Sequence, residues 1–262
     1  MASATGIPQA SPAHAHIHDE GRGEDEPLLG RRGDVSQPEG RALYHNVYTG
    51  TAAIAQAGIV LLIASVWASV FLNKLLPFVS PHPLLNSAGI LFITQAILIV
   101  QPTHTAQQKR EGTIAHFTLN TLGVSSLIAG LIIIEINKFR NNPPHHFQSV
   151  HAILGLITYI VLALQALVGF TAYFVPQLYG GVNQAKSLYK WHRISGYIVF
   201  LLLLATVAAA TQTDYNKNVL DIKLWAVLVC SVLIVIGVFP RIKKEKLGLV
   251  KPETRPSGAF GQ

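Results

Sequence analysis

Four histidines recur along the chain at intervals of about one helix plus one loop, each near the start of a long apolar run. They are His82, His116, His151 and His192. Histidine is a common axial ligand of haem iron, and an iron with two imidazole ligands has no position open for oxygen. Histidines with this spacing could therefore hold metal centres that carry single electrons and do not activate oxygen.

Small and polar residues repeat after each histidine. "HPLLNSAG" begins at His82 and "HFTLNTLG" at His116, whereas "HAILG" and "HRISG" each have a glycine four residues after the histidine. Offsets of four and seven return to the same helix face, so we expect each histidine to stand above a residue without a side chain, where a flat group has room. Gln165 lies on nearly the same face as His151. The residues predicted to bind the cofactor are Gly89, Gly123, Gly155, Gly196, Asn86, Asn120 and Gln165.

The apolar residues indicate a membrane protein. Half of the 262 residues are apolar and 13% are charged, whereas a soluble domain usually has about 25% charged residues. A helix needs roughly 20 residues to cross the hydrocarbon core, and continuous apolar runs favour helices over strands. We predict an all-α integral membrane protein, a six-helix transmembrane bundle in which helices two to five form a di-haem core. The six runs are 51–72, 83–100, 114–136, 150–175, 194–210 and 222–239.

The basic residues predict the orientation in the membrane. Most of the 20 lysines and arginines fall in segments that share one side when six helices alternate in direction. The positive-inside rule places that side, and both termini, in the cytosol. His82 and His151 then share the outer leaflet, and His116 and His192 share the inner one. The net charge of +7 follows from this topology and does not indicate a nucleic-acid partner.

The chain divides into three predicted parts: a disordered cytosolic tail at 1–42, a six-helix domain at 43–240 and a basic cytosolic tail at 241–262. In the first tail, Glu24 with Leu28 and Leu29 resembles the acidic dileucine signal that clathrin adaptors read. This predicts adaptor proteins as partners and an endosomal or vacuolar/lysosomal membrane as the location.

Four stretches carry a family resemblance. They are "HPLL" at His82, "HF" at His116, "SVHAILGL" around His151 and "LYKWHRISGY" around His192. With them the chain resembles the cytochrome b561 family over about 45–240, and in particular its short stand-alone branch. The resemblance implies two non-covalent haem b groups, ligated by His82/His151 and by His116/His192. It also implies one-electron transfer from a cytosolic reductant such as ascorbate to monodehydroascorbate or a ferric chelate.

The candidate substrate residues flank the histidines. Arg110 precedes His116 by six residues, and Lys186 precedes His192 by six. Lys109 and Lys190 lie close to them in the sequence. Cations there could bind an acidic reductant, although the positive-inside rule alone also explains them. His146 lies just before His151 and is a candidate for binding the acceptor.

Two observations leave the function open. Ascorbate-using members of the family carry a motif like "ALLVYR" at the end of helix two, where this chain reads "AILIVQPTH" without the arginine. Histidines within a bundle also suit a proton or solute transporter without haem, or an assembly subunit that does not use them. The partners predicted with electron transfer are lipid and a small-molecule donor and acceptor, and a homodimer is also possible.

Overall fold

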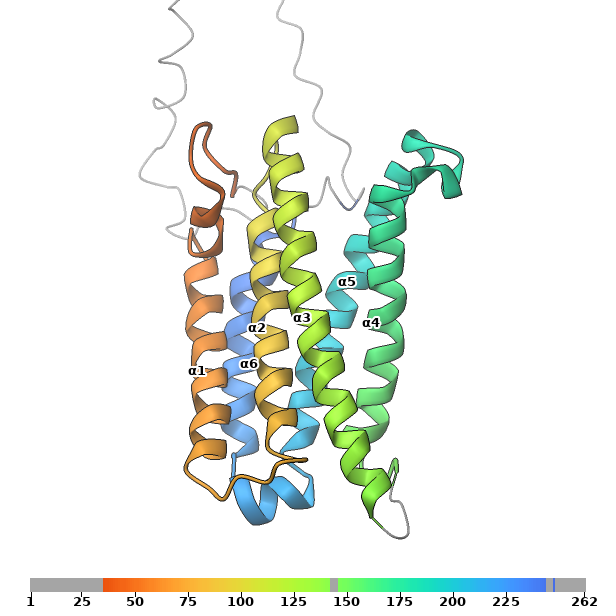
Figure 1. The fold of residues 1–262 in the computed structure, drawn as a ribbon. Helices are drawn as coiled ribbons and strands as arrows, with labels where there is room; N and C mark the ends of the chain where they lie inside the picture. Colours follow the sequence, from red (N-terminus) through yellow and green to blue (C-terminus); the bar gives the residue numbers. More distant parts are fainter. Residues whose placement is uncertain (1–34, 142–145, 244–246, 248–262) are drawn as a thin grey trace, which may run out of the picture.

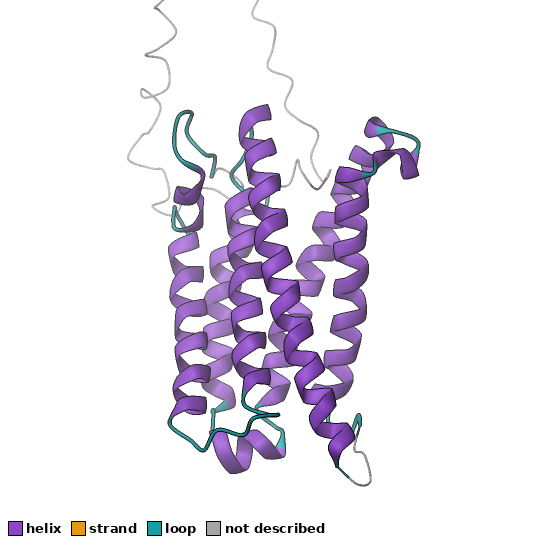
Figure 2. Ribbon diagram, viewed as in Figure 1, coloured by secondary structure: helices purple, strands orange, loops and turns teal. Residues whose placement is uncertain are grey.

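The computed structural model describes residues 35–141, 146–243 and 247. Within them the chain forms six long helices and no strand, which confirms the predicted all-α bundle (Figure 2). Each of the six, the last counted through Arg241, is long and apolar enough to cross a membrane. The proposed sorting signal at Glu24, Leu28 and Leu29 lies outside the described residues. The helices are α1 (Ala52–Phe71), α2 (Pro81–Val100), α3 (Ala106–Arg140), α4 (Val150–Phe174), α5 (Val182–Ala210) and α6 (Leu224–Val238).

Successive helices run in opposite directions. The starts of α1, α3 and α5 therefore lie at the same end of the bundle as the ends of α2, α4 and α6, at the top of Figure 1. We call this the terminal end, because the first and last described segments also lie there, and we call the other the opposite end. The described residues also contain four short helical segments: η2 (Leu43–Val47), η3 (Pro176–Tyr179), η4 (Asn216–Leu220) and η5 (Phe239–Arg241).

Two helices begin well before the apolar runs that predicted them. α3 starts eight residues before its run, and α5 starts twelve residues before. The extra turns are polar and escape a search for apolar residues. At the start of α3 a capping box adds a local reason, since the backbone amide of Gln108 donates to Thr105 Oγ1 at 3.2 Å and Gln108 Oε1 accepts from the Thr105 amide at 3.4 Å.

These early starts change where the histidines lie along their helices. His82 and His151 are each the second residue of their helices, at the opposite end. His116 and His192 lie ten residues into α3 and α5, about 15 Å from the helix starts. Nearly three helical turns of α3 and α5 therefore extend beyond the histidines at the terminal end.

The helices pack in three close pairs, α1 with α6, α2 with α3, and α4 with α5. At the first of these, a Cβ on Gly58 would lie 2.8 Å from the Cys230 carbonyl oxygen, so only glycine allows the observed approach. Cys230 itself is a buried free thiol. In the described part of the chain, the α4–α5 pair keeps a larger backbone separation from the α2–α3 pair, as Figure 1 shows. The four histidines come from these two separated pairs.

Candidate functional site

The four histidines form two facing pairs, one towards each end of the bundle. The ring centres of His82 and His151 are 6.0 Å apart, with an angle of 81° between the ring planes. Those of His116 and His192 are 6.5 Å apart, at 78°. Each pair joins a helix of the α2–α3 pair to a helix of the α4–α5 pair. The structure thus brings together the same partners that topology had suggested.

The separation within each pair suits one metal ion. A metal ion binds an imidazole nitrogen at about 2 Å, and the ring centre lies about 1 Å further, so two imidazoles on opposite sides of one ion have ring centres roughly 6 Å apart. Both observed separations agree with this value. Within the described residues, three or more histidine, cysteine or acidic side chains do not gather into a metal-binding cluster. A centre with two protein ligands, as haem iron has, fits better than a structural zinc site.

The ring nitrogens add a second test of this fit. A metal-bound histidine commonly donates its other ring N–H to a backbone carbonyl, which fixes the tautomer and the ring orientation. Three of the four histidines have this arrangement, and because a carbonyl can only accept, their Nε2 atoms keep the lone pair that a metal ligand needs. The Nδ1 bonds run from His82 to Gly130 O at 2.9 Å, from His116 to Ala96 O at 2.8 Å and from His151 to Thr206 O at 2.9 Å.

His192 has a different neighbour. The amide Nε2 of Gln165 lies 3.1 Å from His192 Nδ1 and donates to the His192 carbonyl at 2.7 Å, while Gln165 Oε1 accepts from Ser195 at 2.7 Å. Gln165 therefore lies beside the terminal-end pair, as its spacing from His151 suggested. It contacts the ring and the backbone of His192 directly.

The two repeated asparagines make the same local bond. Asn86 Nδ2 donates to the His82 carbonyl at 2.7 Å, and Asn120 Nδ2 donates to the His116 carbonyl at 2.8 Å, in each case four residues back along the helix. Asn86 also accepts a hydrogen bond from the hydroxyl of Tyr159 at 2.7 Å. The repeat thus places an amide directly below each histidine, and Asn120 lines the cavity described below.

The expected reason for two of the glycines needs correction. A Cβ on Gly89 would lie 2.7 Å from Leu127 Cγ, and one on Gly123 would lie 2.9 Å from Ile93 Cγ1. The space next to both is filled by the neighbouring helix, so they allow α2 and α3 to pack closely and do not leave room for a flat group. A Cβ on Gly155 would meet only Thr206, at 3.8 Å.

The glycines nearest to the histidine rings and their amides belong to neighbouring helices. A Cβ on Gly169 of α4 would lie 2.7 Å from Cε1 of His192, and one on Gly130 of α3 would lie 2.5 Å from Asn86 Nδ2. A Cβ on Gly196 would lie 2.9 Å from Gln165 Nε2. Sequence reasoning missed Gly169 and Gly130 because it considered only offsets within the helix that carries each ligand.

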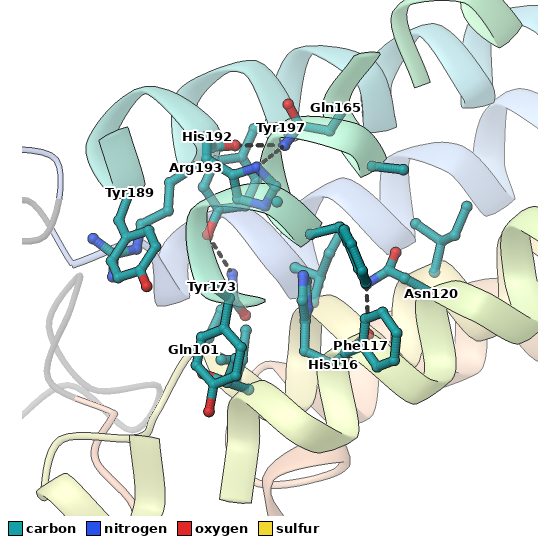
Figure 3. Close-up of a pocket in the computed structure, with 18 of the residues that line it drawn as sticks. Gln101, His116, Phe117, Asn120, Gln165, Tyr173, Tyr189, His192, Arg193 and Tyr197 are labelled. Atoms are coloured by element: carbon teal, nitrogen blue, oxygen red, sulfur yellow. Dashed lines mark hydrogen bonds between the residues drawn. The ribbon is translucent and has the colours of Figure 1, made fainter. Parts of the chain in front are cut away.

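A cavity of about 680 Å³ surrounds the terminal-end pair and continues towards the end of the bundle. His116 and His192 both line it, and Figure 3 shows them on facing sides. The turns of α3 and α5 that precede these histidines form part of its wall. Its other polar and charged lining residues include Gln101, Lys109, Asn120, Gln165, Tyr173, Tyr189, Arg193, Tyr197, Arg241 and Lys243.

Only one of the four basic residues predicted to bind substrate lines this cavity. Lys109 lines it, whereas Arg110, Lys186 and Lys190 are not among its described lining residues. Lys190 Nζ instead lies 5.2 Å from the ring centre of Trp191. Three cations that the spacing argument did not select also line the cavity: Arg193, Arg241 and Lys243. The rim is cationic, but most of the basic residues that form it differ from those predicted.

A polar cluster lies near the other end of α3. Glu135 accepts from Lys138 Nζ at 3.1 Å and pairs with His146 Nδ1 at 3.0 Å. The His146 ring packs on Phe139 with 4.7 Å between ring centres. Its Nε2 atom is buried and has no hydrogen-bond partner among the described residues. His146 is thus held by a carboxylate, with a second nitrogen left over for another group.

Tyr159 and Arg241 are further site residues that sequence reasoning missed. Tyr159 lies two helical turns after His151, a spacing that could have revealed it. Its hydroxyl contacts both Asn86 Oδ1 and the Leu127 carbonyl at 2.7 Å. Arg241 had no such signal, because it looked like one more basic residue after the last helix.

Comparisons with known proteins agree with this architecture. The family model for eukaryotic cytochrome b561 matches residues 81–220, which carry all four histidines. "Ascorbate-specific transmembrane electron transporter 2" of Zea mays is 27% identical over 58% of this chain and 65% of its own length. "Transmembrane ascorbate ferrireductase 2" of Arabidopsis thaliana is 31% identical over 48% of this chain and 53% of its own. "Transmembrane ascorbate-dependent reductase CYB561" of Homo sapiens is 25% identical over 48% and 49%.

The aligned region spans about half to two thirds of the length of these curated relatives. Their names describe electron transport or reduction, which does not favour a histidine-dependent transporter without haem. The match to the family model covers more than half of the chain and includes four of the six long helices, α2 to α5, in full. The chain belongs to the eukaryotic cytochrome b561 family.

Proposed function

We propose that this protein carries single electrons across a membrane by means of two non-covalent haem b groups. His82 and His151 hold one, and His116 and His192 hold the other. The observation that carries the proposal is the pair of facing imidazole pairs, with ring centres 6.0 and 6.5 Å apart. Family membership supports it independently. Bound between two imidazoles, haem iron supplies a one-electron couple without an open coordination position.

The two histidine pairs lie at different depths in the bundle, which supports two separate centres. His116 Nδ1 bonds the carbonyl of Ala96, which lies fourteen residues after His82 on α2. The two pairs are therefore separated by about 21 Å along the bundle axis. Leu127 and Leu162 are among the apolar side chains buried in the core. This spacing suits two successive transfers, each shorter than the thickness of the membrane.

The cavity at the terminal end suits an anionic reductant. Lys109, Arg193 and Lys243 line it, and a cationic opening attracts an acidic reductant such as ascorbate. The positive-inside rule places this end in the cytosol. At the opposite end, His146 is the candidate to meet monodehydroascorbate or a ferric chelate. An endosomal or vacuolar/lysosomal membrane, adaptor binding through Glu24, Leu28 and Leu29, and a homodimer remain part of the proposal on sequence grounds.

A haem assay followed by a transfer assay tests this function. The purified protein should contain two non-covalent haems per chain and show a low-spin bis-histidine spectrum on reduction. In vesicles loaded with ascorbate and oriented with the terminal end inside, it should reduce an external ferric chelate. Absence of haem after expression with ample haem supply would overturn the proposal. Two haems without transfer to either a ferric chelate or monodehydroascorbate would overturn the transmembrane role.

A further inference from the structure

A buried chain of hydrogen bonds runs from the end of α6 to the wall of the terminal-end cavity. Arg241 Nε donates to Gln101 Oε1 at 3.1 Å, and Gln101 Nε2 donates to the hydroxyl oxygen of Tyr197 at 3.1 Å. Arg241 is 1% exposed and Gln101 is 7% exposed. Figure 3 shows the last of these bonds, between Gln101 and Tyr197. The chain joins residues that are far apart in the sequence.

The direction of every bond in this chain is fixed by its first member. A guanidinium can only donate, so the oxygen of the Gln101 amide must face Arg241, and the nitrogen must face away from it. The two hydrogens of that nitrogen go to the Tyr197 oxygen and to the Val238 carbonyl, each at 3.1 Å. The Tyr197 oxygen is therefore an acceptor from Gln101, and its own proton must be donated in another direction.

Arg241 is held too firmly to reverse this arrangement. Its Nη2 donates to the Asn46 carbonyl at 2.8 Å and to the Leu98 carbonyl at 3.3 Å, and its Nη1 donates to the Thr49 carbonyl. Leu98 lies in the last turn of α2, where the helix dipole favours a cation. The guanidinium thus links the segment before α1, the end of α2 and the end of α6 at one point.

Tyr197 lines the cavity, one helical turn after Arg193 and five residues after His192. The charged side chains among the described lining residues are all basic: Lys109, Arg193, Arg241 and Lys243. A hydroxyl that donates into a cationic cavity is suited to an oxyanion. Gln101 also occupies the position at which the "ALLVYR"-like motif ends in arginine. Because Arg241 donates to Gln101, a guanidinium still lies next to that position.

We propose that Arg241 and Gln101 are positioning residues that direct the Tyr197 hydroxyl into the cavity as a hydrogen-bond donor to an oxyanion. The oxyanion is either that of the reductant or a propionate of the haem between His116 and His192. The proposal rests on the proposed function, because both sources of the oxyanion belong to it. Tyr197 makes the contact, and Arg241 and Gln101 act through it.

Two substitutions test the proposal in the full-length, haem-loaded protein. Tyr197→Phe removes the donor. Gln101→Glu keeps a partner for Arg241, but a carboxylate only accepts, so the Tyr197 proton turns towards residue 101 and away from the cavity. Both should cause the same change in the readouts given below. If the lost bond joins a hydroxyl to a charged oxygen, the affected binding or redox equilibrium constant should change by about tenfold. Tyr179→Phe is the matched control, since the Tyr179 hydroxyl bonds Thr171 at 2.7 Å outside the cavity.

The readouts separate the two sources of the oxyanion. A rise in the KM for ascorbate at unchanged midpoint potentials assigns the contact to the reductant. A lower midpoint potential of the terminal-end haem at unchanged KM assigns it to a propionate. An unchanged KM and potential in folded Tyr197→Phe protein with two haems would overturn the donor role. Haem content, measured first, distinguishes this outcome from failure of the proposed function.

The double variant tests the positioning role by a readout that a structural role would not move. If Gln101→Glu acts through Tyr197, adding it to Tyr197→Phe should produce no further change. Additive effects would mean that the new carboxylate acts by its own charge, and would overturn the proposal for Gln101 and Arg241. The cycle also covers the case in which Arg241 variants fail to fold, since it leaves Arg241 in place.

Discussion

The two ends of the bundle each hold a facing pair of histidines, in different surroundings. At the opposite end, His82 and His151 begin their helices, and the Glu135, Lys138 and His146 cluster lies near the end of α3. At the terminal end, α3 and α5 continue for nearly three turns beyond His116 and His192 and help to form a cavity. The histidine pairs set the chemistry that each end can do. The helix lengths decide whether a small molecule can enter beside them.

The two ends also differ in the charges of their side chains. The charged side chains described in the terminal-end cavity are all basic. The opposite-end cluster instead pairs the Glu135 carboxylate with the Lys138 ammonium group, and His146 contacts the same carboxylate. A uniformly cationic cavity attracts an anion, whereas a balanced cluster provides individual ligating or donor groups without a strong net field. In the proposed function this assigns binding of the reductant to the terminal end.

Removal of one histidine from a pair should have the largest effect, because it tests directly whether the two ends are separate haem sites. His192→Ala should lose the terminal-end haem, and His82→Ala should lose the other, because neither centre has a spare ligand within reach in the described structure. Each variant should retain about one of its two haems, measured by quantifying extracted haem, and the remaining haem should keep its midpoint potential. Loss of both haems from a folded variant would show that the two halves are not independent.

Substitution of the glycine beside a ligand should have the next largest effect. A Cβ at position 169 would lie 2.7 Å from Cε1 of His192, which comes from another helix, so Gly169→Ala must displace the ring or the helix. We expect a large loss of the terminal-end haem with the opposite-end haem retained. Gly58→Ala is the control, because its Cβ would also lie too close to a neighbour, 2.8 Å from the Cys230 carbonyl oxygen, but in the α1–α6 pair, which carries none of the four histidines. Equal haem contents in the two variants would contradict the role of Gly169.

Much of this architecture could be predicted from the sequence. Apolar runs and alternating topology gave six helices, and the same topology gave the two histidine pairs, because both depend on periodic features of the chain. Gly89 and Gly123 were predicted to leave room for a flat group, but close packing between α2 and α3 explains them instead. Local spacing cannot reveal which helix lies against which face, so it also missed Gly169 opposite His192.

The cations show the same limit more strongly. Arg110 and Lys186 each lie six residues before a terminal-end histidine, yet neither is among the described lining residues of the cavity. Arg241 lies far from every histidine in sequence and still reaches the cavity wall through contacts with Asn46, Leu98 and Gln101. Such contacts between distant segments depend on tertiary packing, which a single sequence does not encode in any periodic pattern.

Tyr159 allows a smaller test confined to the opposite-end pair. Its hydroxyl contacts Asn86 Oδ1 and the Leu127 carbonyl, so Tyr159→Phe removes a donor from two acceptors in a partly buried site. We expect the free energy of unfolding to fall by about 1–2 kcal/mol. Thermal unfolding, monitored by the release of haem, measures this free energy. The midpoint potential of the terminal-end haem should stay unchanged, and a change there instead would contradict the separation of the two halves.

The exposed lysines should give the smallest effect and the finest test of the cavity. Lys109 lines the cavity and Lys186 does not, although both lie shortly before a terminal-end histidine. Lys109→Ala should raise the KM for ascorbate by about threefold, because an exposed charge contributes little in water, and the difference should shrink as salt is added. Lys186→Ala should leave the KM within error of the unsubstituted protein. An equal rise in KM for both variants would mean that the reductant responds to the general positive charge of this end. It would contradict the assignment of the cavity as the binding site.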